Sequence, residues 1–90
     1  MGNNKYTAQL RGSFKAGQEL YSQMQEAATG IIQNVVHLGV QVEPGTMIVI
    51  NNKEIEIGQT GIYEIYNTKI TSLYFKNDVS NVLIDYVVKI

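Results

Sequence analysis

The sequence predicts a mainly β domain: a small antiparallel β-sandwich or barrel of about six or seven strands, preceded by one N-terminal helix. Two observations favour this fold. Short segments with alternating apolar and polar residues recur about every 8 to 12 residues, and turns rich in Gly and Asn separate them. The length of 90 residues is sufficient for one hydrophobic core.

The N-terminal third is predicted to differ from the rest. Residues 1–16 are polar and interrupted by glycine, so they are expected to form a partly ordered arm. Residues 17–30 carry apolar side chains at spacings of 1, 3 and 4, which indicates an amphipathic helix that ends at Gly30. The expected organisation is an arm and helix over residues 1–30, followed by a β-sandwich domain over residues 31–90.

Residues 31–42 are compatible with two structures. The apolar residues from 31 to 38 can continue the helical stripe, whereas every second residue from Val36 to Val42 is apolar, which is typical of a strand. We favour the strand because β-branched residues predominate.

The remaining chain reads as turns and strands. Glu43, Pro44 and Gly45 fit a type II turn, and Asn51-Asn52 fits the turn of a hairpin between residues 46–50 and 53–58. Further strands are expected over residues 61–66 and 69–75. The last strand, residues 82–90, is nearly apolar on both faces, which predicts a central place in a sheet or a place against a partner.

Composition argues against several classes of partner. The net charge is −1, and the seven Lys and Arg residues are scattered singly, so nucleic acid is not expected to bind. No apolar stretch approaches the length of a membrane span, so no membrane partner and synthesis in the cytoplasm are expected. The absence of cysteine excludes disulfides and thiolate chemistry.

Catalysis is not expected either, nor is a cofactor or a metal. His37 is the only histidine, so no histidine dyad is possible, and it is predicted to be a surface residue without an acidic neighbour. No calcium-loop pattern accompanies the carboxylates, which are Glu54, Glu56, Glu64, Asp78 and Asp85. We predict a protein that is not an enzyme.

Two groups of side chains are candidate contact surfaces. The helix has a neutral, Gln-rich polar face that suits subunit packing, although a helix that lies on its own sandwich fits the pattern equally well. The candidate interface residues are Leu20, Tyr21, Met24, Ala27 and Ile31. Tyrosine is enriched at interfaces and in sugar-binding platforms, so the candidate ligand or partner surface comprises Tyr63, Tyr66 and Tyr74.

Five short motifs lie between residues 39 and 86. They are G-x-Q-x-x-P-G at 39–45, I-N-x-x-x-I-x-I-G at 50–58, TGIYEI at 60–65, I-T-S-L-x-F at 70–75 and IDY at 84–86. With these motifs, residues 36–90 resemble small virion-associated proteins of tailed bacteriophages that infect Gram-positive hosts. The resemblance implies a tail, baseplate, neck or capsid-decoration component, located in the virion, that assembles as a trimer or ring. It carries over no catalytic residue.

The sequence thus leads to one expectation and one alternative. The expectation is a non-enzymatic structural protein of a phage virion, which oligomerises through its helix and its β-domain and binds itself and other virion proteins. The alternative is a host-surface carbohydrate-binding module that uses the tyrosines as stacking surfaces. The position in the particle and the symmetry number stay open.

Overall fold

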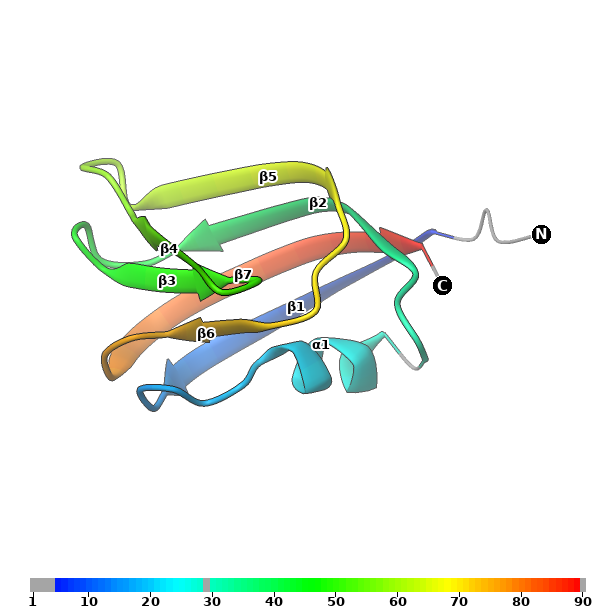
Figure 1. Cartoon of the computed structure of the whole chain (residues 1–90), viewed down its shortest axis with the longest axis horizontal. Coiled ribbons are helices and arrows are strands. Elements are labelled where there is room, and N and C mark those ends of the chain that lie inside the picture. Colours follow the sequence, from blue (N-terminus) through cyan, green and yellow to red (C-terminus); the bar gives the residue numbers. More distant parts are fainter. Residues whose placement is uncertain (1–4, 29, 90) are drawn as a thin grey trace.

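The computed structural model describes residues 5–28 and 30–89. Residues 1–4 and 29, part of the predicted arm and helix, and Ile90, in the predicted last strand, lie outside this range. Within it the chain forms seven strands and one helix (Figure 1). In chain order these elements are β1 (Lys5–Phe14), α1 (Tyr21–Ala27), β2 (Asn34–Gln41), β3 (Met47–Ile50), β4 (Lys53–Glu56), β5 (Ile62–Thr68), β6 (Leu73–Phe75) and β7 (Val79–Lys89).

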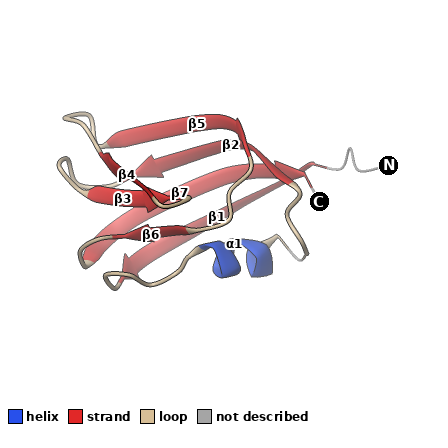
Figure 2. Ribbon diagram, viewed as in Figure 1, coloured by secondary structure: helices blue, strands red, loops and turns tan. Residues whose placement is uncertain are grey.

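The strands form two antiparallel sheets (Figure 2). Sheet A has four strands in the order β1-β7-β2-β5, and sheet B has three in the order β4-β3-β6. Neither sheet closes into a barrel. The mainly β prediction is therefore confirmed, and the arrangement is sandwich-like.

The core lies between the inner faces of the two sheets and extends beneath α1. Alternate residues of β7 are buried from Val82 to Val88, and they meet fully buried side chains of β2 such as Leu38. The rings of Phe14 and Phe75 stack with centroids 6.5 Å apart and join β1 to sheet B. In the described part of the chain, no charged side chain is buried.

Residues 5–14 form a strand, where the sequence predicted an arm. β1 is an edge strand of sheet A and pairs with β7 from Lys5 opposite Lys89 to Phe14 opposite Val79. Ala8 and Leu10 pack against the core. The alternation is weak because Ala8 is small and Gly12 has no side chain. The strand connects residues 5–14 to the β-domain, so residue 30 does not separate two structural units.

Helix α1 spans seven residues, fewer than the predicted fourteen, and it packs on the chain's own core. Leu20, at its N-terminal end, and Met24 are fully buried. Tyr86 is also buried, and its hydroxyl donates a hydrogen bond to the Met24 carbonyl at 3.0 Å. Of the two alternatives for this helix, the structure therefore shows the one in which it lies on the sandwich.

A carboxylate at the start of α1 ties the helix to sheet B. Glu19 accepts hydrogen bonds from the Leu73 N–H at 2.7 Å, the Ser72 hydroxyl at 2.7 Å and the Tyr21 N–H at 3.0 Å. Burial raises the pKa of Glu19, but these hydrogen bonds outweigh burial and hold the pKa below its ordinary value. The ionised carboxylate therefore stabilises this junction.

The local turn predictions are confirmed. The Thr46 N–H donates to the Glu43 carbonyl, and Gly45 adopts a φ of 87°, as a type II turn requires. Asn51 and Asn52 have φ values of 51° and 66° and close the β3–β4 hairpin.

Three predictions concerned longer strands. Residues 34–41 form β2, which confirms the strand over the helix, and β7 lies between β1 and β2, which confirms its central place. The strand predicted over residues 69–75 is wrong for its first part. Only residues 73–75 are strand, because the Asn51 side chain accepts hydrogen bonds from the Thr71 and Ser72 N–H groups and holds residues 69–72 as a loop.

The stability of the fold is expected to fall steeply at alkaline pH because of Tyr86. Burial, and to a lesser extent the charge of Tyr6, raises the pKa of Tyr86 to about 12 from an ordinary value near 10. Below pH 10 the phenol is neutral in both the folded and the unfolded state. Between pH 10 and 12 the unfolded chain loses the proton first, so the free energy of unfolding decreases as the pH rises.

Denaturant unfolding of the wild type and of Tyr86→Phe between about pH 8 and pH 12 measures this effect. We expect the substitution to lower stability at neutral pH by about 1 kcal/mol through the lost hydrogen bond. We also expect the alkaline slope to be shallower in the variant. Equal slopes in the two proteins would contradict the assignment of the slope to Tyr86.

Candidate functional site

Sheet A has one face against the core and one face turned away from it. Sheet B and α1 both lie on the core side, so no strand or helix of the described residues covers the other face (Figure 1). The strand register defines the side chains of this outward surface, because residues paired across strands share a face. We call this surface the open face.

Three rows of four residues run across the open face in the order β1, β7, β2, β5. They are Arg11, Leu83, Gln41 and Ile62 in the first row, Gln9, Asp85, Gly39 and Glu64 in the second, and Thr7, Val87, His37 and Tyr66 in the third. Lys5, Lys89 and Asn34 continue the pattern at one end.

The open face exposes large apolar side chains. Ile62 is 50% exposed and Tyr66 is 60% exposed, and both project from the outer side of the edge strand β5. Leu83 and Val87 of β7 are half-buried on the same face. A face of this kind, apolar side chains among single charges, is typical of a protein–protein contact surface.

A polar cluster occupies the β2–β5 side of the open face. The His37 Nε2 lies 3.2 Å from the Glu64 Oε2, and the His37 ring lies 4.9 Å from the Tyr66 ring. The prediction that His37 has no acidic neighbour is therefore wrong. Glu64 lies 27 positions later and reaches His37 through the β2–β5 pairing.

Asp85 fills the space over Gly39 in the middle row. A Cβ on Gly39 would lie 2.5 Å from the Asp85 Oδ1 and 3.6 Å from the His37 Cε1. The carboxylate and the imidazole thus both lie over the glycine. The missing side chain at position 39 lets the polar cluster sit low on the sheet.

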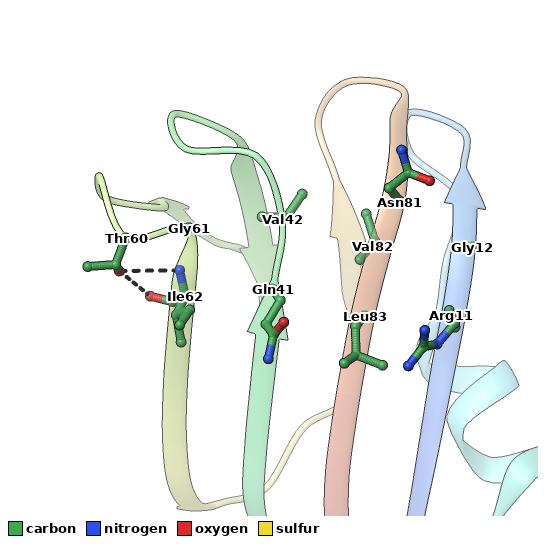
Figure 3. A pocket seen from close by; sticks show the side chains of 10 residues that line it. All are labelled: Arg11, Gly12, Gln41, Val42, Thr60, Gly61, Ile62, Asn81, Val82 and Leu83. Carbon is green, nitrogen blue, oxygen red and sulfur yellow. Dashed lines mark hydrogen bonds between the residues drawn. The ribbon is translucent and has the colours of Figure 1, made fainter.

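A shallow hollow of about 610 Å³ lies at the loop end of the open face (Figure 3). The first row forms part of its lining: Arg11 and Gln41 supply polar groups, and Ile62 and Leu83 supply apolar surface. Thr60 exchanges hydrogen bonds with the backbone of Ile62 at its rim. Arg11 makes no ion pair with any residue of the described part of the chain.

Comparison with protein-family models, with curated proteins and with solved structures finds no match for this chain. The function must therefore be inferred from the site itself.

The structure separates the predicted interface residues of the helix. Leu20 and Met24 are fully buried in the chain's own core, so their side chains cannot form a seam with another molecule while this fold persists. Tyr21 and Ala27 are partly buried. Ile31 is 80% exposed, but it lies in the loop after α1.

The three predicted surface tyrosines do not lie together. Tyr66 belongs to the open face, whereas Tyr63 packs toward the core from the other side of β5. Tyr74 lies on β6 in sheet B, opposite Val49. A single stacking platform built from all three is therefore absent from this fold.

The carboxylates considered for catalysis fall into two groups: Glu64 and Asp85 lie in the polar cluster around His37 and Gly39, and the others lie elsewhere. Glu54 pairs with Lys76 at 3.0 Å, and Asp78 accepts a hydrogen bond from the Ala16 N–H. Glu64 and Asp85 belong to the open face, outside the hollow. No group of three or more His, Cys, Asp or Glu residues able to hold a metal occurs among residues 5–28 and 30–89.

Among the described residues, no helix has the length and hydropathy that crossing a membrane requires.

Proposed function

We propose that this protein is a non-enzymatic assembly component of a phage virion and that the open face of sheet A is its contact surface. One observation carries the proposal: the larger sheet leaves a whole face uncovered, and Ile62 and Tyr66 are exposed on it. Burial of these side chains against a partner would be favourable, because each large apolar side chain contributes about 1.5–3 kcal/mol when it is fully removed from water.

The virion context rests on the resemblance of residues 36–90 to small virion proteins. The fold is compatible with that context. A rigid, low-charge sheet with short connections suits a part that packs into a symmetric array. Tail, baseplate, neck and capsid positions are all consistent with the proposal.

The placement of the ionisable groups also favours binding over catalysis. The contact between His37 and Glu64 is exposed on the sheet face, and these two residues line none of the hollows described, whereas acid–base sites usually lie in a concave pocket that excludes water. The hollow near Arg11 offers a single cationic group and no acid–base pair.

Substitution of Ile62 by Asp is expected to weaken association at least about tenfold, because an exposed apolar contact would be lost and a charge would have to be desolvated in its place. Light scattering over a micromolar-to-millimolar series gives the weight-average mass. The wild type should exceed 10.1 kDa, the monomer mass, and the variant should remain close to it.

Ile31→Asp is the matched control, because Ile31 is even more exposed and lies off the open face. It should associate like the wild type, and circular dichroism should show both variants folded. Equal loss in the two variants would count against the open face. So would a wild type that stays monomeric and binds no purified virion protein.

The carbohydrate-binding alternative has less support, since its three tyrosines lie on different surfaces. What favours it is the hollow, in which Arg11 and Gln41 adjoin apolar surface. Saturable glycan binding by a monomeric wild type would replace the assembly proposal with this one.

A further inference from the structure

The two edge strands of the open face carry charges of opposite sign, while Asp85, Lys89 and His37 lie on its two central strands. Strand β1 contributes Lys5 and Arg11 and no acid, whereas β5, at the opposite edge, contributes Glu64 and no base. Neither Lys5 nor Arg11 forms an ion pair within the described residues. The cationic edge is therefore available to an acidic partner surface, and the chain carries such a surface itself.

We infer that the open face binds a second copy of this chain, with β1 of each copy over β5 of the other. This inference rests on the proposed function and specifies its partner and its docking mode. The twofold axis lies between the two faces and runs parallel to the strands. Such an axis exchanges the edges and keeps each row opposite the same row of the partner.

The contacts across this axis are complementary. Arg11 comes to lie over the partner's Ile62, one row from the partner's Glu64, and rows are about 7 Å apart, within reach of an arginine side chain. Leu83 comes to lie over the partner's Gln41. Two arginine–glutamate pairs per dimer result, one at each edge.

The competing twofold arrangement is unfavourable. An axis perpendicular to the strands would place β1 over the partner's β1 and reverse the order of the rows. Arg11 would then face the partner's Lys5, and Glu64 would lie over the partner's Tyr66. Like charges in direct opposition disfavour that orientation.

The area of the open face limits the strength of the contact. Four strands at about 4.8 Å and three to four rows at about 7 Å cover roughly 400–500 Å² in projection. Standard stable interfaces bury about 800 Å² per partner. The isolated dimer should therefore be weak and reversible, and it should form toward the upper end of the concentration series.

One contact opposes association. Asp85 lies on β7 next to the axis, so the two Asp85 carboxylates of a dimer approach each other. Removal of this charge by Asp85→Asn, which keeps the size of the side chain, is expected to tighten the dimer by about threefold to tenfold. Circular dichroism should show the variant folded, because partial unfolding would also promote association.

A charge exchange tests the docking mode. Arg11→Glu and Glu64→Arg should each weaken self-association about tenfold, because each brings like charges together at both edges. An equimolar mixture of the two variants should associate as strongly as the wild type, since the carboxylate introduced in one variant then meets the guanidinium introduced in the other. Sedimentation equilibrium gives the dissociation constants, and Glu54→Arg, a reversal on sheet B, is the control.

The outcomes separate the proposed function from the docking mode. In one outcome the wild type associates and the Ile62→Asp variant stays monomeric, while the equimolar mixture of Arg11→Glu and Glu64→Arg associates no better than either variant alone. That result would show this docking mode to be wrong and would leave the open-face contact standing. If Ile62→Asp also has no effect, both fail. A wild type that stays monomeric at millimolar concentration yet binds another virion protein through Ile62 overturns the second copy as the partner and leaves the proposed function intact.

Discussion

Deletion of residues 1–30 is expected to unfold this protein rather than to release an assembly arm. The deletion removes β1, which pairs with β7 along its length, and also α1, which covers the core. It would leave β7, a strand that is buried on alternate positions, as an unprotected edge of sheet A.

The lost burial accounts for the size of the effect. Phe14, Leu20 and Met24 are buried large apolar side chains within the deleted segment. At about 1.5–3 kcal/mol each, they contribute about 5–9 kcal/mol. A small domain has a total stability of roughly 5–15 kcal/mol, so little or none would remain.

Far-ultraviolet circular dichroism and amide proton dispersion of the shortened chain, residues 31–90, test this expectation. Met24→Ala in the full chain is the graded control, with an expected loss of about 2–5 kcal/mol and a retained fold. A shortened chain that unfolds cooperatively on heating would show that residues 31–90 form a domain on their own, as predicted from the sequence.

Gly61→Ala is expected to destabilise the protein by about 2–4 kcal/mol. Gly61 adopts a φ of 70°, a conformation that costs about 1–2 kcal/mol for a residue with a Cβ. The added Cβ would also lie 2.6 Å from the Val42 carbonyl oxygen. The Val42 oxygen belongs to the backbone, so it cannot rotate away as a side chain could. The Val42 N–H also donates a hydrogen bond to the Gly61 carbonyl. The clash with the added Cβ can therefore be relieved only if the end of β2 and the start of β5 move apart.

Alanine substitutions at two other glycines separate the cost of the positive φ from the cost of the clash with Val42. Gly45 has a φ of 87° but no atom near the position of a Cβ, so Gly45→Ala should lose only the stability that the positive φ costs a residue with a Cβ. Gly58 has neither constraint, so Gly58→Ala should be close to neutral. Denaturant unfolding of the three variants should rank them with position 61 most affected, then 45, then 58. A loss at position 61 no larger than at 45 would contradict the close approach to Val42.

Features encoded within a few residues could be predicted from the sequence. The turn at Pro44-Gly45 and the hairpin at Asn51-Asn52 follow from the φ values that these residues favour. The central place of β7 could also be predicted from its apolar residues on both faces. β7 does lie between β1 and β2, but Leu83 and Val87 on its outer face belong to the open face, which no described strand or helix covers.

Features that depend on the pairing of strands far apart in the sequence could not be predicted from it. β1 pairs with a strand at the other end of the chain, and its small residues at positions 8 and 12 obscure the alternation. The contact between His37 and Glu64 depends on the register of β5 on β2, and a separate hairpin lies between these two strands in the sequence. Nothing near either residue fixes that register.

The surface against which the helix packs could not be predicted from the sequence either. One apolar stripe that includes Leu20 and Met24 serves equally well for packing on the chain's own sheet or on another molecule. Only the position of β7, which brings Tyr86 beneath the helix, decides between the two. The strand order therefore places the candidate contact surface on the open face and not on the helix.

The most direct test of the open face as the contact surface is a concentration series followed by methyl NMR of isoleucine, leucine and valine side chains. We predict that the methyl signals of Ile62, Leu83 and Val87 shift together as concentration rises. Those of Ile31, exposed elsewhere, and Ile48, in the core, should stay fixed. Shifts that appear at Ile31 while the three open-face residues stay constant would contradict this contact surface.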